Sequence, residues 1–105
     1  RDWGWAPEYV EAMRLMLQQE QADDYIVATG RSHTLEELVA TVFSVLDLDW
    51  REHVEQNSSL MRPTEIKHSL ANPNKVELKL GWKAQYGMKE VMEMMVAECL
   101  KNIEV

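Results

Sequence analysis

The segment Thr34-Leu35-Glu36-Glu37 carries the clearest structural signal in the chain. A threonine followed three residues later by a glutamate is a capping box, in which each side chain can satisfy a free backbone N–H at a helix start. Apolar residues then recur on one face: Leu35, Leu38, Val39, Val42, Phe43 and Leu46. The spacing predicts an amphipathic helix that begins after Thr34 and ends before Asp47-Leu48-Asp49.

On the N-terminal side the sequence predicts a helix and then a strand. Pro7 suits the first turn of a helix, because its missing N–H would be unpaired there. Val10, Met13 and Leu17 follow at helical spacing, so residues 7 to about 19 are expected to be helical. Residues 25–29 are apolar without alternation and are closed by Gly30, which is typical of a strand buried on both faces.

On the C-terminal side, residues 53–56 are a candidate for a second short strand. Asn72 is expected to cap a short helix that has Pro73 in its first turn and Gly81 as the left-handed residue beyond its end. A last helix is predicted from a regular apolar stripe: Met88, Val91, Met92, Met95, Val96, Cys99, Leu100 and Ile103.

These elements predict an α/β fold, of the α+β-like kind, as one domain over residues 1–105 with about four helices and one or two short strands. Two strands alone are marginal in water, so they need a partner. We therefore expect a homodimer, and a monomer whose helices cover the strands is the alternative. The patch expected to be buried between copies combines aromatic residues with the last helix: Trp3, Trp5, Met88, Met92, Met95 and Cys99.

Charge and composition exclude several classes of function. The formal net charge is −7 and the 11 basic residues are scattered, so nucleic acid is not an expected partner. No apolar stretch approaches the roughly 20 residues that span a bilayer, so no membrane association is expected. The single Cys99 allows no internal disulfide and fits a reducing, cytoplasmic setting.

The chain lacks the usual signals for dinucleotide binding and catalysis. Its four glycines form no Gly-x-Gly-x-x-Gly turn, which a Rossmann cofactor site needs. No Tyr has a Lys four residues later, and the three histidines have no metal-ligand spacing. We expect no catalytic residue, no metal ligand and no cofactor site within these 105 residues.

Several motifs nevertheless occur together and in order. They are Arg1-Asp2-Trp3-Gly4-Trp5, Arg62-Pro63-Thr64-Glu65, Asn72-Pro73-Asn74-Lys75 and Leu80-Gly81-Trp82-Lys83. With them the chain resembles the C-terminal, substrate-binding part of GDP-mannose 4,6-dehydratases, which are extended short-chain dehydrogenases/reductases. The resemblance implies a lyase that uses NADP, whose cofactor domain and catalytic residues lie upstream of the matching part.

The resemblance also implies which residues bind substrate. Arg1 and Arg62 would contact phosphate and Glu65 would contact ribose. Without the resemblance, Arg62 and Glu65 would be interpreted as an exposed ion pair, worth under about 1 kcal/mol. The resemblance also implies that the loop from Thr29 to Thr34 lies near the ligand, and the alternative is that Ser32-His33-Thr34 is only a helix-capping turn.

The aromatic and methionine residues also leave alternatives open. Trp3, Trp5 and Tyr9 either stack on a base or pack at the helix start, and packing is favoured. The Met-rich stripe is favoured as core or interface over a binding groove.

Two functions remain. The first is a separated or partial substrate-binding lobe that binds GDP-mannose or a related nucleotide sugar weakly and is inactive alone. The second is a stand-alone interaction or oligomerisation module that keeps the fold and has lost the ligand.

Overall fold

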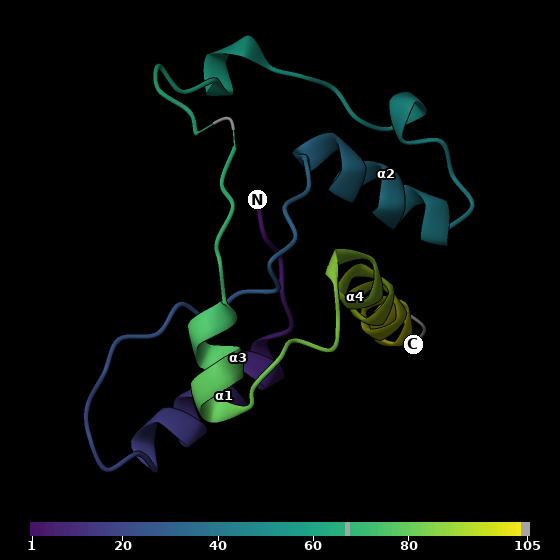
Figure 1. Ribbon diagram of the computed structural model, residues 1–105. Helices are drawn as coiled ribbons and strands as arrows, with labels where there is room; N and C mark the ends of the chain where they lie inside the picture. Colours follow the sequence, from purple (N-terminus) through teal and green to yellow (C-terminus); the bar gives the residue numbers. More distant parts are fainter. Residues whose placement is uncertain (67, 104–105) are drawn as a thin grey trace.

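The computed structural model describes residues 1–66 and 68–103, and these residues form helices joined by long irregular segments (Figure 1). The α-helices are α1 (Ala6–Leu17), α2 (Leu35–Val45), α3 (Asn74–Leu80) and α4 (Met88–Ile103). Two 3₁₀ turns follow α2: η1 (Trp50–Glu52) and η2 (Ser58–Leu60). The four predicted helices are therefore confirmed, whereas the α/β class is wrong, because the described residues contain no strand.

The two predicted strands fail for a common physical reason: their backbone groups bond to something other than a neighbouring strand. In residues 25–29, the N–H of Thr29 donates to the carboxylate of Asp2 at 3.3 Å. Ile26, in the middle of this run, is 56% exposed and not buried on both faces. Residues 53–56 follow the 3₁₀ turn η1, and the N–H of His53 bonds back to the carbonyl of Trp50 at 3.0 Å.

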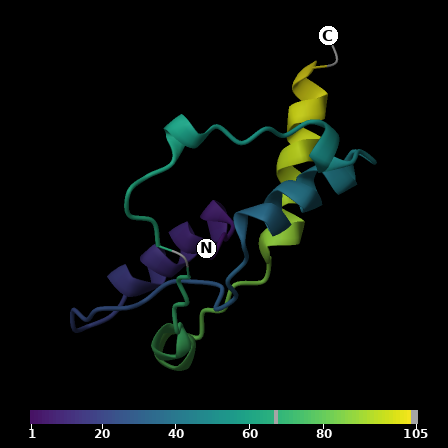
Figure 2. The same ribbon diagram turned by 90° about the horizontal axis from the view of Figure 1, so that it is seen from above.

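The helices pack as two pairs, each around its own small core. In the first pair, α1 and α3 bury Ala12, Val76 and Trp82, with Tyr9 and Leu15 packed against them. In the second, α2 lies across α4 and covers Met88, Val91 and Met92 (Figure 2). Trp3 and Trp5 complete this second core from the N-terminal segment, which runs between the two pairs.

Most residues of the predicted dimer patch lie in the second core of the same chain. Met88 is 5% exposed and Met92 is 9% exposed, because Trp3 and Trp5 of the same chain cover them. Met95 is 52% exposed and Cys99 is also exposed. The patch proposed from the sequence is therefore wrong as a continuous surface, since most of its members meet inside one chain.

Helix α1 presents the opposite face from the one that its apolar spacing suggested. The predicted stripe is turned to solvent, with Val10 62%, Met13 58% and Leu17 87% exposed. The packed face instead centres on Ala12, whose small side chain lets α1 approach Val76 and Trp82 closely. An apolar stripe without a partner therefore remains on the outside of the helix.

A carboxylate joins the two helix pairs. The Oε2 of Glu8 accepts the N–H of Gln85 at 2.7 Å, and its Oε1 accepts the N–H of Tyr86 at 3.1 Å. The carbonyl of Glu8 accepts the indole N–H of Trp82 at 2.9 Å. Gly81 starts this connection in the left-handed region, at φ 68°, as predicted for a residue that ends α3. The path from α3 to α4 is thus fixed from the first turn of α1.

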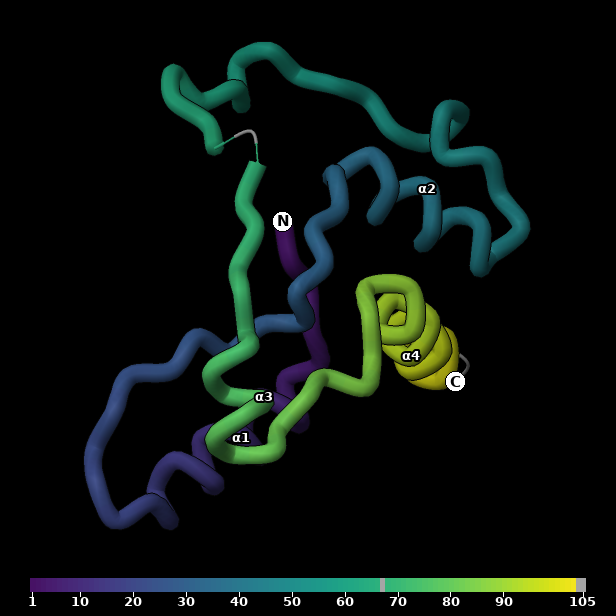
Figure 3. Tube along the Cα trace, viewed as in Figure 1, coloured from purple at the N-terminus to yellow at the C-terminus, as the bar shows by residue number. Residues whose placement is uncertain are grey.

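The molecule is open. Its radius of gyration is 17.1 Å, against about 13 Å for a compact domain of this length. The segment between α2 and α3 lies against α2 at η1 and then arches away from the helices (Figure 3), and all its described residues from 51 to 70 are exposed. Within the described residues, no helix is both long enough and apolar enough to cross a bilayer.

Candidate functional site

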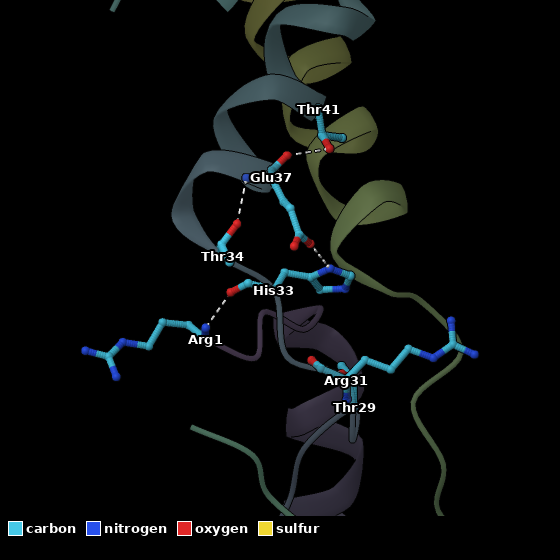
Figure 4. Close-up of polar contacts among 7 residues, drawn as sticks. All are labelled: Arg1, Thr29, Arg31, His33, Thr34, Glu37 and Thr41. Atoms are coloured by element: carbon cyan, nitrogen blue, oxygen red, sulfur yellow. Dashed lines mark hydrogen bonds and ion pairs between the residues drawn. The ribbon is translucent and has the colours of Figure 1, made fainter. Parts of the chain in front are cut away.

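The candidate site lies where the N-terminal segment meets the turn that precedes α2. Arg1 and His33 exchange two backbone hydrogen bonds, from Arg1 N to His33 O at 2.6 Å and from His33 N to Arg1 O at 2.7 Å (Figure 4). Such an exchange is the pattern of one hydrogen-bonded pair in an antiparallel ladder. It fixes where the side chain of Arg1 begins relative to the turn.

Asp2 fixes the same turn from the other side. Its Oδ1 accepts the hydroxyl of Thr29 at 2.7 Å, and its Oδ2 accepts the N–H of Gly30 at 2.9 Å. Gly30 has a φ of 84°, a backbone angle that residues other than glycine rarely adopt. Sequence reasoning gave Asp2 no role, and its place beside Arg1 was the only signal that could have suggested one.

The start of α2 confirms half of the predicted capping box. The hydroxyl of Thr34 accepts the N–H of Glu37 at 3.1 Å, as expected. The carboxylate of Glu37 does not reach back to Thr34 but contacts Nδ1 of His33 at 2.8 Å. This contact with His33 is the largest of the effects that lower the pKa of Glu37. The segment Ser32-His33-Thr34 is therefore a capping turn that also lines a cavity.

The three predicted substrate-binding residues meet at that cavity. Nη2 of Arg1 lies 2.9 Å from Oε1 of Glu65, and Nε of Arg62 lies 3.9 Å from Oε2 of the same carboxylate. The side chains are 41% exposed for Arg1, 51% for Glu65 and 76% for Arg62. The ion pair inferred between Arg62 and Glu65 exists, but the shorter pair joins Glu65 to Arg1 across the fold.

The cavity has a volume of about 880 Å³, which falls in the range of pockets that hold small organic ligands. One wall is the turn before α2 and the other is the exposed segment that carries Arg62 and Glu65. Its apolar lining includes Trp3, Leu60, Met61 and Ile66. Two guanidinium groups beside apolar surface suit a ligand that has both an anionic and a flat apolar part.

The predicted aromatic platform is divided between different parts of the molecule. Trp3 and Trp5 pack against the methionines of α4, whereas Tyr9 meets Trp82 edge-on at a centroid distance of 5.9 Å. Packing is thus the correct interpretation of this group. Trp3 alone of the three also lines the cavity.

The described residues show no arrangement suited to a metal or to a dinucleotide. No three His, Cys, Asp or Glu side chains among them come close enough to hold an ion. Gly30 and Gly81 adopt positive φ values, but they lie in a turn held by Asp2 and at the end of α3, respectively. Neither position offers the glycine-rich helix start that holds a pyrophosphate in a Rossmann site.

Comparison with known proteins gives a consistent result over nearly the whole chain. A family model described as GDP-mannose 4,6 dehydratase matches residues 1–95. GDP-mannose 4,6 dehydratase 1 of Arabidopsis thaliana is 46% identical over 101 residues, which are 96% of this chain and 28% of that protein.

More distant relatives carry the same description. The Dictyostelium discoideum GDP-mannose 4,6 dehydratase is 36% identical over 121 residues, covering 99% of this chain and 34% of that protein. The Homo sapiens protein is 33% identical over 113 residues, covering 91% of this chain and 30% of that protein. The chain thus spans about a third or less of the length of these relatives.

Proposed function

This chain belongs to the GDP-mannose 4,6-dehydratase family, and we propose that it is the part of such an enzyme that binds the nucleotide end of GDP-mannose. In this proposal Arg1 and Arg62 hold the pyrophosphate and Glu65 accepts hydroxyl groups of the ribose. The observation that carries it is the convergence of these three side chains at one cavity from two distant segments.

The chemistry of the side chains supports these roles. A guanidinium presents a planar fork of N–H donors that matches two phosphate oxygens at once. A carboxylate accepts hydrogen bonds from neighbouring hydroxyl groups. Pro63 has a fixed φ and so restricts the backbone between Arg62 and Glu65.

The proposal gives this chain no catalytic step of its own. The dehydratase reaction of the family would need NADP and a general base, and neither a dinucleotide turn nor a Tyr followed four residues later by Lys occurs in this sequence. Those functions are assigned to parts of the family protein that this chain does not include. We expect no 4-keto-6-deoxy sugar when the purified chain is mixed with GDP-mannose and NADP. Product formed by a preparation free of host enzyme would contradict this part of the proposal.

Calorimetry with GDP-mannose tests the binding role. We expect a dissociation constant no tighter than roughly 100 μM, or about 5.5 kcal/mol, because one wall of the cavity is an exposed segment. Arg62→Ala should remove detectable binding. Arg51→Ala is the matched control, since Arg51 lies over the ring of Trp50 and does not line the cavity. Low-micromolar affinity would contradict the expected weak binding and indicate a complete site, and unchanged affinity in Arg62→Ala would refute the phosphate role of Arg62.

A second candidate function is self-association, as an interaction module. It is favoured by the exposed apolar stripe of α1, made of Val10, Met13 and Leu17. A two-fold dimer would use one such stripe twice. Light scattering at micromolar concentration should then give a mass of two chains, and Met13→Glu should reduce it to one. A mass of one chain for the parent protein would exclude this function.

A further inference from the structure

The carboxylate of Glu65 occupies the position where an anionic ligand would meet the two arginines. One of its oxygens lies 2.9 Å from Nη2 of Arg1 and the other lies 3.9 Å from Nε of Arg62. Both cations proposed to bind phosphate are thus already near a carboxylate of the same chain. A ligand that binds through phosphate alone would have to separate Arg1 from Glu65.

We propose that Glu65 is an internal counter-anion that makes this cavity select nucleotides over bare phosphates, an inference that rests on the function proposed above. When a phosphate binds Arg1, Glu65 loses its closer ion pair and lies beside a new negative charge. A nucleotide also brings ribose hydroxyl groups, which donate hydrogen bonds to the freed carboxylate. Inorganic pyrophosphate brings no such donor, so its binding free energy is reduced by the full free energy of the broken ion pair.

The other charged groups of the cavity do not relieve this cost. Glu37 also lines it and adds negative charge, but it is already held at 2.8 Å by Nδ1 of His33. His68 lines the cavity as well, and it belongs to the same exposed segment as Glu65. Arg1 and Arg62 are the guanidinium groups of the cavity for which Glu65 and a phosphate compete.

The size of the effect follows from exposure. The side chains of Arg1 and Glu65 are 41% and 51% exposed, so water and salt screen their attraction. Exposed ion pairs of this kind are worth up to about 1 kcal/mol, which is about a fivefold change in a binding constant. We therefore expect removal of the carboxylate to strengthen pyrophosphate binding by roughly two- to fivefold.

Three probes separate the contributions: inorganic pyrophosphate, GDP and 2′,3′-dideoxy-GDP. Each is titrated at low salt into the parent chain, Glu65→Gln and Glu65→Ala, with near-ultraviolet circular dichroism as a check that the tryptophan packing is kept. Glu55→Gln is the matched control, because it removes one exposed carboxylate from the same segment without touching the cavity.

Both Glu65 variants should bind pyrophosphate two- to fivefold more tightly than the parent, and Glu55→Gln should not. The parent should prefer GDP over dideoxy-GDP, and Glu65→Ala should lose that preference. Unchanged or weaker pyrophosphate binding in both Glu65 variants would overturn the selectivity role of Glu65. If GDP binding is also weaker in these variants, the contact between Glu65 and ribose is still supported. Failure of all three probes to bind the parent at millimolar concentration would overturn the proposed function together with this inference.

Discussion

The turn at residues 29–34 and the segment at residues 51–70 face each other across one cavity, yet they are held in different ways. The turn donates hydrogen bonds to the carboxylate of Asp2, and its backbone is paired with that of Arg1. The opposite segment is exposed at every described residue, and Glu65 ties it to Arg1 through a partly exposed ion pair. One wall of the cavity is therefore built by backbone hydrogen bonds, and the other depends on a contact that salt screens.

This difference indicates which part of the site the chain can form alone. Hydrogen bonds that backbone N–H groups donate to a carboxylate are among the stronger polar contacts in proteins. An exposed ion pair contributes little and weakens as salt is added. The first wall should thus persist under conditions that release the second.

The largest expected contrast comes from removing one apolar side chain in the helical part and one in the exposed segment. Trp82 is 5% exposed and donates its indole N–H to the carbonyl of Glu8, so Trp82→Ala should lower the free energy of unfolding by about 3–5 kcal/mol. Leu60 is 78% exposed, and Leu60→Ala should change the free energy of unfolding by less than about 0.5 kcal/mol. Urea unfolding followed by circular dichroism measures both. Similar losses in the two variants would mean that the exposed segment is packed in solution.

The next contrast removes a carboxylate from each wall. Asp2→Ala removes the acceptor of the Gly30 N–H and the nearer acceptor of the Thr29 hydroxyl, and we expect the free energy of unfolding to fall by about 2 kcal/mol. Glu65→Ala should cost less than about 1 kcal/mol. Hydrogen exchange at the amide of Gly30 should accelerate in the first variant and stay unchanged in the second. Equal protection of Gly30 in Asp2→Ala and the parent would argue against the role assigned to Asp2.

A third test concerns the segment that carries Arg1 and Asp2 into the site. A Cβ at Gly4 would lie 2.0 Å from the hydroxyl of Tyr9, whose ring is held against Trp82. Gly4→Ala should therefore cost about 1–3 kcal/mol, as forced overpacking does. Gly87→Ala is the control, because its Cβ would meet the carboxylate of Glu90 at 3.1 Å, at the far end of a flexible side chain. Thermal unfolding should shift clearly for Gly4→Ala and little for Gly87→Ala, and the reverse order would refute this account of Gly4.

The smallest expected effect is a dependence on pH at a third polar contact, between α3 and the segment that connects α1 to α2. Hydrogen bonding from Lys75 is the main cause that lowers the pKa of Asp23 from 3.8 to about 2. A carboxyl with a lowered folded-state pKa adds stability above its ordinary pKa, and this contribution disappears as the pH falls through the folded value. The difference in unfolding free energy between the parent and Asp23→Asn should thus shrink between about pH 4 and pH 2. A constant difference over that range would show that Asp23 and Lys75 are not paired in solution.

The sequence predicted the helices well because their signals are local. Thr34 caps α2 and Gly81 ends α3, and each needs a few neighbouring residues to act. The prediction for Asn72 is met only in part: its side chain accepts the N–H of Asn74 at 3.0 Å, but Pro73 stands at the cap position and not in the first turn of α3. Capping and turn chemistry can therefore be read from the sequence without the rest of the fold.

The strand and the packed face of α1 could not be predicted in the same way. A strand needs a neighbouring strand as its hydrogen-bond partner, whereas the N–H of Thr29 donates to the side chain of Asp2 in the N-terminal segment. The stripe of Val10, Met13 and Leu17 indicated the apolar face of α1, but Ala12 permits the closer approach of another helix. Which apolar face is covered depends on what surrounds the chain, and spacing alone does not contain that information.

The candidate site shows both situations. Arg1, Arg62 and Glu65 were inferred from motifs, and they do lie around one cavity. The contribution of Asp2 was missed because it acts on backbone N–H groups that only the folded turn brings to it. Positioning residues of this kind leave a weak trace in a sequence, since a single aspartate fits many roles.

The backbone pairing of Arg1 with His33 fixes which side of the N-terminal segment each side chain after Arg1 occupies. In extended chain successive side chains point to opposite sides, so Arg1 and Trp3 line the cavity while Asp2 points to Thr29 and Gly30. A shift of the pairing by one residue would exchange the two sides and direct the carboxylate of Asp2 at an incoming phosphate. The register of the pairing thus decides whether this segment presents a positive or a negative side chain to a ligand. A single inserted residue in the segment would reverse that charge without altering any functional side chain.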